Sequence, residues 1–196
     1  MLSGPLATDP AAGEGATHPD PDLSAVSAAQ RDSAAFAALY HRYLDAIYSY
    51  AFYQLGDHHD AEDATARTFM AALRGIGSFR NEGASFRAWL FRIARNTIAN
   101  AHRTRARRRT EPIDAIPLEP PAPDADPAGL ALRAEEARRI RAAVVALPDD
   151  RRQVVLLRFA DGLSAREIGE VLDRSEGAVR VLLHRALKDL AEQLNP

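Results

Sequence analysis

A proline-rich stretch in the middle of the chain limits what it can fold into. Residues 110–130 have acidic residues and almost no apolar pattern between six prolines: Pro112, Pro117, Pro120, Pro121, Pro123 and Pro127. Because proline removes a backbone donor and blocks helix formation, this stretch predicts an extended, acidic, flexible linker. The 196 residues suffice for two small domains, and we expect one on each side of the linker.

Composition indicates a globular protein outside the membrane. Hydrophobic residues make up 46% of the chain, the net charge is −2, and there is no cysteine to form a disulfide or a thiolate metal site. We find no apolar run that would span a bilayer and no signal-type N-terminus, so we expect a cytoplasmic protein. Residues 1–29 are rich in Pro, Gly, Ala and Asp without periodicity, and we expect them to be a disordered tail.

Residues 30–109 show helical periodicity and form the first predicted domain. One helix is expected from about Asp32 to Gln54, with Gly56 beyond its end, and a second from about His58 to Gly75, capped by Asp57. A long basic helix follows, with a predicted buried stripe of Phe86, Trp89, Leu90, Ile93 and Ile98.

The opposite face of this basic helix is cationic. We expect Arg87, Arg92, Arg95, His102 and Arg103 to point to solvent, and no acidic residue interrupts the sequence between Glu82 and Glu111. Solvated helix faces usually mix both signs, so this asymmetry favours phosphate binding. The preceding loop offers an aromatic ring and polar groups that suit an unstacked base, at Phe79, Arg80, Asn81 and Ser85.

One cluster in the second predicted helix has side chains of the type that bind metals. His58, His59, Glu62 and Asp63 lie together in the sequence, but adjacent histidines point in different directions on a helix. His58 with Glu62 gives one pair at most, and no third ligand has a useful spacing. We therefore predict neither a metal nor a cofactor, and interpret the cluster as a solvated first turn.

Residues 131–196 form the second predicted domain. Ser164 to Glu167 has the capping-box pattern, and a short helix with Ile168, Val171 and Leu172 inward is expected to end at Asp173. A longer helix starts at Ser175, with the predicted inward residues Val179, Leu183, Leu187 and Leu190. This order is typical of a helix-turn-helix, whose second helix enters the major groove, although an ordinary helical hairpin would show it too.

The sequence resembles the sigma factors of bacterial RNA polymerase, and specifically their extracytoplasmic-function branch, which keeps only regions two and four. The first domain carries WLFRIARN at residues 89–96, and the second carries LPDDRRQVVLLRFADGLSAREIGEVLDRSEGAVRVLLHRALKDL. The resemblance implies an all-α fold with two small helical domains, region two at 30–109 and region four at 131–196. It also implies a promoter-specificity subunit that is not an enzyme.

The resemblance assigns three sets of residues. Region two would hold the separated minus-ten strand through Phe79, Arg80, Asn81, Ser85, Arg92, Asn96, Asn100 and Arg103. Region four would read the duplex minus-thirty-five element through Arg174, Ser175, Glu176, Arg180, His184, Arg185 and Lys188. The clamp helices of core RNA polymerase would dock on Asp60, Glu62, Asp63, Thr68 and Phe69.

The resemblance also implies further partners. The polymerase flap would hold region four, and an anti-sigma factor would cover both domains. The family pattern differs at two positions: Arg67 stands where an acid is usual, and Asp173 where the turn usually has glycine. Charge alone suggests that the acidic linker folds back on the basic helix.

Two other classes of protein stay open at this stage. A stand-alone transcriptional regulator would bind an operator through the same helix-turn-helix, but it would need a dimerisation or ligand-binding domain. A nucleic-acid enzyme would use the cluster around His58, and chelation would then abolish its function. Neither explains why a strand-capturing loop, a proline-rich linker and a duplex reader occur in this order.

Overall fold

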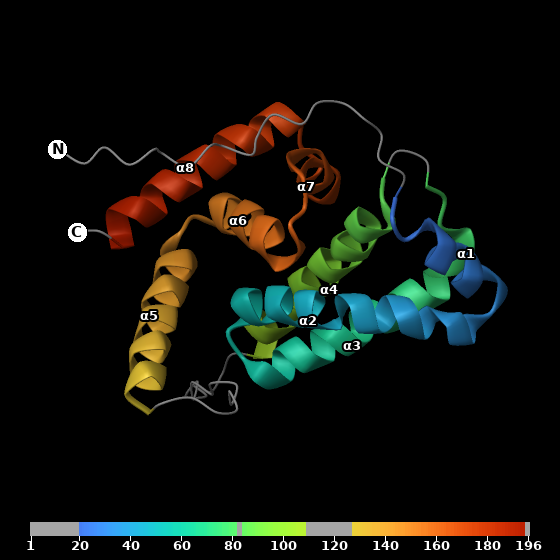
Figure 1. Cartoon of the computed structure of the whole chain (residues 1–196), viewed down its shortest axis with the longest axis horizontal. Coiled ribbons are helices and arrows are strands. Elements are labelled where there is room, and N and C mark those ends of the chain that lie inside the picture. The colour runs from blue at the N-terminus through green and yellow to red at the C-terminus, as the bar shows by residue number, and fades with distance from the viewer. Residues whose placement is uncertain (1–19, 82–83, 109–126, 195–196) are drawn as a thin grey trace.

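The computed structural model describes residues 20–81, 84–108 and 127–194. Within these residues it contains eight α-helices, two short 3-10 helices and no strand (Figure 1). The predicted all-α fold is therefore confirmed. No helix in the described ranges is long and apolar enough to cross a membrane.

The helices form two units, one on each side of residues 109–126. The first unit consists of α1 (Leu23–Arg31), η1 (Ser33–Ala35), α2 (Phe36–Leu55), α3 (His58–Gly75), η2 (Ile76–Ser78) and α4 (Phe86–Arg108). The second consists of α5 (Pro127–Ala146), α6 (Asp149–Asp161), α7 (Ala165–Leu172) and α8 (Glu176–Leu194). The two units pack together, α6 on α2 and α7 on α4 (Figure 1).

Two boundaries differ from the sequence prediction. Helix α1 lies within the predicted tail, and Val26 and Ala29 pack in the core, so the disorder prediction is wrong for residues 20–29. The rest of that tail lies outside the described residues. Helix α5 begins at Pro127, within the predicted linker, because proline is well tolerated in the first turn of a helix.

Local capping explains most of the helix boundaries. The Asp57 side chain accepts a hydrogen bond from the Asp60 amide at 2.9 Å and starts α3, while Gly56 adopts a left-handed conformation with φ of 71° and ends α2. Ser164 and Glu167 form the predicted capping box of α7. These three predictions are confirmed.

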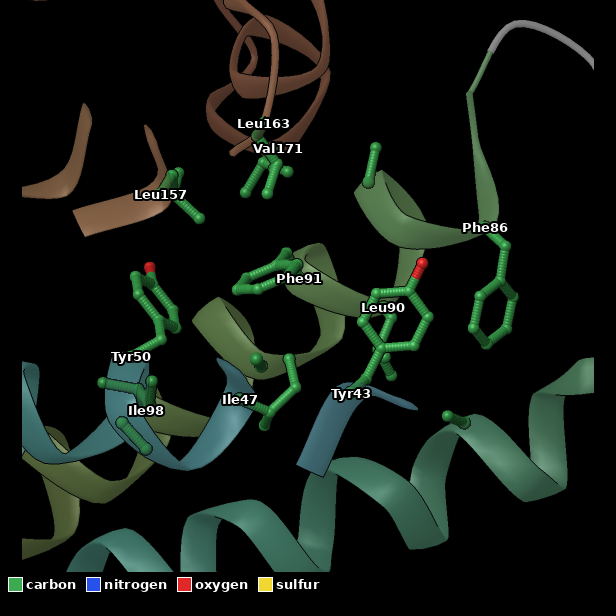
Figure 2. Close-up of a cluster of buried hydrophobic side chains, with 14 of the residues drawn as sticks. Tyr43, Ile47, Tyr50, Phe86, Leu90, Phe91, Ile98, Leu157, Leu163 and Val171 are labelled. Carbon is green, nitrogen blue, oxygen red and sulfur yellow. The ribbon is translucent and has the colours of Figure 1, made fainter. Parts of the chain in front are cut away.

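One continuous apolar core joins the two units. Helix α4 contributes Leu90 and Phe91, both fully buried, and the Phe91 ring meets Tyr50 of α2 edge-on at 5.7 Å between centroids. Figure 2 shows Leu157 of α6 and Val171 of α7 pointing toward the same rings. The core therefore extends from α2 through α4 into the second unit.

The predicted stripe on α4 is only partly correct. Phe86, Leu90 and Ile98 are buried as expected, while Trp89 and Ile93 are half-buried. Phe91 was not predicted to be buried, because it lies off the stripe and is covered by residues distant in sequence.

The turn between α7 and α8 depends on a close backbone approach. Asp173 ends α7, as the sequence predicted, and adopts a left-handed conformation with φ of 57°. A Cβ atom at Gly169 would lie 2.5 Å from the carbonyl oxygen of Arg174, well inside van der Waals contact. Glycine at 169 therefore allows the two helices to meet.

Substitution of Gly169 is expected to destabilise the protein. Gly169→Ala should lower the free energy of unfolding by about 1–3 kcal/mol, because the backbone of Arg174 must shift to accommodate the methyl group. Chemical denaturation measures this. The control is Gly177→Ala in α8, where a Cβ meets nothing within 4 Å. An equal effect of both substitutions would contradict the close-approach argument.

Candidate nucleic-acid interface

Part of the predicted minus-ten face of α4 is exposed. Arg92, Asn96, Asn100 and Arg103 recur at helical spacing on one side of α4, and all four are exposed. Arg103 donates a hydrogen bond to the side-chain oxygen of Asn100, which holds the guanidinium beside the amide. This side of α4 thus presents cationic and amide groups together.

The loop before α4 departs from the prediction in one respect. The Phe79 ring is buried between Phe86 and Trp89, with centroids 5.8 and 5.1 Å away, so it is not available to stack on a base in this arrangement. Arg80 and Asn81 are exposed, and Arg80 donates to the Phe79 carbonyl at 2.9 Å. The polar part of the predicted loop site is accessible, and its aromatic part is not.

The remainder of the α4 face is covered by the second unit. Arg87, which was expected in solvent, donates to both carboxylate oxygens of Glu167 at 3.1 and 2.6 Å. It also donates to the Asp161 carbonyl at 2.9 Å, and its Nη1 lies 3.6 Å from the Asp161 carboxylate. Ser85 donates to Glu167 at 2.8 Å. The sequence prediction for Arg87 is therefore wrong.

Two further arginines of α4 contact the second unit. Arg92 donates to the Glu170 carbonyl at 3.1 and 2.6 Å, and Arg95 donates to the Gln153 side chain at 3.2 Å. Arg95 is half-buried rather than solvated. Because these partners lie 58 and 78 residues away in sequence, no local pattern reveals them.

The environment of Glu167 strongly favours its charged form. Burial alone would raise the pKa of this carboxyl, but hydrogen bonds from Arg87, the Ser164 amide and Ser85, with the Arg87 charge, lower it to about 2. The neighbouring Asp161 differs, because its burial outweighs Arg87 and raises the pKa. Glu167 is therefore the principal anion that faces α4.

The contribution of Glu167 to stability should depend on pH. A carboxyl whose pKa is depressed in the folded state stabilises that state above its unfolded pKa, and the effect is lost as pH falls from about 5 to about 2. Glu167→Gln keeps a capping residue at this position but removes the charge. It should cost about 1–3 kcal/mol at pH 7.

Denaturation of both proteins at pH 7 and at pH 3.5 measures this effect. The stability difference between wild type and Glu167→Gln is expected to shrink at the lower pH. A difference that stays constant between the two values would contradict the assignment of the charged pair.

Helix α8 presents the predicted duplex-reading residues to solvent. Exposed positions on the turn and on α8 include Arg174, Ser175, Glu176, Arg180, His184, Arg185 and Lys188. The Ser175 hydroxyl accepts from the Ala178 amide at 3.3 Å, and Arg180 donates to Glu176 at 2.5 Å. Val179 is buried and Leu183 and Leu190 pack against the core as predicted, but Leu187 was expected inward and is 49% exposed. Ala186 is buried in its place.

The predicted polymerase-docking residues on α3 divide into two groups. Asp60, Glu62 and Asp63 lie on its first turns, where Asp63 pairs with Arg67 at 2.9 Å and Asp60 lies 3.4 Å from Arg105. Thr68 and Phe69 are buried: the Thr68 hydroxyl donates to the Ala64 carbonyl, and Phe69 packs on Tyr40. The latter two are therefore wrong as surface contacts.

The exposed apolar side chains of α3 were missed in the sequence. Met70 is 51% exposed and Leu73 is 41% exposed. Both follow the acidic turn along the helix. Their hydrophobic character made them look like core residues, and only the packing of α3 shows otherwise.

The His58 cluster is dispersed in the structure. His58 meets the Tyr48 hydroxyl through Nδ1 and packs on the Phe52 ring, while His59 lies 3.9 Å from Glu62. Among the described residues, no three His, Asp or Glu side chains converge in a way that could hold a metal ion.

Two family models match the chain in the order of its two units. Residues 39–108 match sigma-70 region 2, and residues 137–190 match sigma-70 region 4. The fold and its two candidate faces thus define a protein of the sigma-70 class.

Individual relatives specify the branch. The chain is 38% identical over 160 residues to the ECF RNA polymerase sigma factor BldN of Streptomyces coelicolor, covering 82% of this chain and 60% of BldN. It is 32% identical to SigW of Bacillus subtilis, covering 83% of this chain and 90% of SigW. The chain therefore belongs to the ECF sigma factors, although it spans only about 60% of the length of BldN.

A solved structure agrees with this assignment. CnrH, solved in complex with the cytosolic domain of CnrY, matches with a TM-score of 0.67 and 26% identity. The match covers 89% of this chain and 97% of CnrH. The similarity therefore includes both helical units.

Proposed function

We propose that this chain binds core RNA polymerase in the cytoplasm and directs promoter-specific initiation, as a specificity subunit rather than an enzyme. The single observation that carries this proposal is that one chain exposes two different polar and basic faces, on α4 and on α8. The α4 face offers arginine and asparagine groups beside a loop, as single-strand capture requires. Helix α8 offers exposed basic groups after a tight turn, as major-groove reading requires.

The domain boundaries follow from the same proposal. Region two, predicted at residues 30–109 and extended by α1 in the structure, opens the minus-ten element. Region four, predicted at residues 131–196 and preceded by the start of α5 at Pro127, reads the minus-thirty-five element. The linker before α5 threads through the core enzyme. Extruding a base from the stack costs a few kcal/mol, and Arg80, Asn81 and Asn96 are exposed partners that would offset this cost.

The covered part of α4 implies that the free protein is closed. The Arg87 guanidinium, which would otherwise be available to a phosphate, donates to Glu167. The Arg92 guanidinium likewise donates to the Glu170 carbonyl. DNA and the second unit therefore compete for the same groups. Promoter capture requires the two units to separate, and binding to core polymerase supplies the alternative contacts that hold them apart.

An anti-sigma factor is the second proposed partner. CnrH was solved with the cytosolic domain of CnrY, and this chain shares its fold over both units. A protein that binds both units would favour the closed state over the polymerase-bound one. Because the chain has no cysteine, redox control would have to act through such a partner.

Pull-down with core RNA polymerase, followed by run-off transcription on a genomic promoter library, tests the proposed function. Transcripts that share two spaced upstream elements, and that appear only with this protein, are expected. Tight binding to duplex DNA without association with core polymerase would instead indicate a stand-alone regulator.

Loss of Arg180 should weaken promoter selectivity. Arg180→Ala removes a guanidinium that can pair with guanine, a contact that contributes roughly 1–3 kcal/mol of discrimination, so transcription should fall about tenfold or more. Arg138→Ala in α5, where the arginine pairs with Glu135, is the control for loss of one positive charge. Equal promoter use by the two variants would exclude Arg180 from readout.

Loss of an exposed apolar group on α3 should weaken polymerase binding. Met70→Glu is expected to reduce affinity for core polymerase about tenfold or more, because a carboxylate would then be buried in the docking surface, while the melting temperature changes little. The control is Val145→Glu in α5, where the side chain is similarly exposed at 52%. Affinity titration with labelled protein measures both, and unchanged binding by Met70→Glu would remove α3 from the docking surface.

A further inference from the structure

Helix α1 contacts the beginning of the candidate strand-capturing loop. The side-chain amide of Gln30 donates two hydrogen bonds, to the carbonyls of Ile76 and Phe79, each at 2.9 Å. Ile76 is the first residue of η2, and Phe79 follows its end and immediately precedes Arg80. One side chain therefore fixes the point at which the backbone leaves the helical core.

The residues before α1 contact the other end of the loop. One carboxylate oxygen of Asp20 accepts from the backbone amide of Phe86 at 2.7 Å, at the first residue of α4. The other oxygen accepts from the Asp22 amide at 3.0 Å. The Phe86 amide is one of the donors that a helix start leaves without an intrahelical partner, so Asp20 satisfies it from a distant segment.

This segment is itself firmly attached to the domain. The Asp22 side chain is 1% exposed and accepts hydrogen bonds from Arg42 and from the Tyr43 hydroxyl, both on α2. Burial and the hydrogen bond to Asp22 raise the pKa of Tyr43, so its hydroxyl remains a donor at physiological pH. The segment that carries Asp20 and Gln30 is thus held on α2 through Asp22.

We propose that Asp20 and Gln30 are positioning residues that hold both ends of the loop in the geometry needed to capture the unpaired minus-ten strand. This inference rests on the proposed function, but residues 20–31 lie outside the matched region 2 range of 39–108. Pre-organised polar groups bind a flexible strand better because less conformational freedom is lost on binding. The brace consists of one amide on the N-terminal side of the loop and one carboxylate on its C-terminal side.

The position of Gln30 distinguishes this role from a purely structural one. Gln30 is exposed, so water can replace its amide when it is removed, and global stability should change little. The loop, however, would lose the two bonds that fix its first carbonyls. A functional loss larger than the stability loss is the expected signature.

The test compares Gln30→Ala, Gln30→Glu and Asp20→Ala with the control Ser27→Ala, an exposed position on the same helix. Amide exchange measured by NMR at Phe86 reports the Asp20 bond directly. Exchange at Phe79 reports the Gln30 bonds indirectly, because the Phe79 amide donates to the Ile76 carbonyl that Gln30 also binds. Exchange of the Phe79 amide is expected to become about tenfold faster in both Gln30 variants, and that of Phe86 in Asp20→Ala. Asp20→Asn, which keeps an acceptor oxygen, should restore slow exchange at Phe86.

The functional measurement uses the full chain with core polymerase on a promoter recovered by the run-off assay, and on the same promoter with a pre-opened minus-ten bubble. The three brace variants should bind the bubble template about tenfold more weakly than wild type, with melting temperatures close to that of Ser27→Ala. Unchanged exchange at Phe79 and Phe86 would overturn the brace, whatever the promoter result. Faster exchange with unchanged bubble binding, or binding loss only in proportion to thermal destabilisation, would overturn the positioning role. Failure of the wild type itself to initiate transcription would instead refute the proposed function, and the positioning role with it.

Discussion

Helix α4 is buried on two sides, and this double burial determines how the other helices pack. On the side toward α2, Phe86 meets Tyr43 and Phe91 meets Tyr50. Leu157 of α6 and Val171 of α7 lie in the same cluster as Phe91 (Figure 2), and Arg87 bonds to residues of α6 and α7. The apolar contact at Phe91 and the ionic contact at Arg87 are adjacent, so the shared core shields the ion pair from solvent. The exposed polar side of α4 then carries Arg92, Asn96, Asn100 and Arg103.

This arrangement makes the closed state specific without making it irreversible. A partly buried ion pair gains little beyond the cost of removing its charges from water, and it contributes mainly to orientation. Glu167 serves both as the α7 cap and as the partner of Arg87, so the same carboxylate starts the helix and orients it on α4. Under the proposed function, a polymerase surface that offers alternative contacts would open the protein at moderate cost.

Local chemistry explains which features could be predicted from the sequence. The caps at Asp57 and Ser164, the left-handed Asp173 and the exposed residues of α8 depend on neighbours within a few positions, and the sequence displays them. Features created by distant contacts could not be found in this way. The sequence predicted that Phe79 stacks on a base, but the rings of Phe86 and Trp89 bury it. It predicted that Arg87 is solvated, but Glu167 pairs with it.

Distant contacts also explain why the sequence prediction failed for the N-terminal segment, which was expected to be disordered. Its Pro, Gly and Asp content is typical of a disordered tail, but in residues 20–31 two aspartates and one glutamine meet partners from three other helical segments. The disorder prediction rested on residue content and on the lack of a clear helical pattern. Neither property reveals the hydrogen-bond partners that distant parts of the chain provide.

The most direct test of the account is the distance between the two units in the free and the polymerase-bound protein. The chain has no cysteine, so Ala38→Cys on α2 and Ala191→Cys on α8, both exposed, allow specific attachment of a fluorophore pair. We expect the transfer efficiency of the free protein to decrease markedly on addition of core polymerase, and to be partially decreased in the free Glu167→Gln variant. Equal efficiency in the free and bound states would contradict the claim that α7 covers the DNA-binding face of α4 and must leave it.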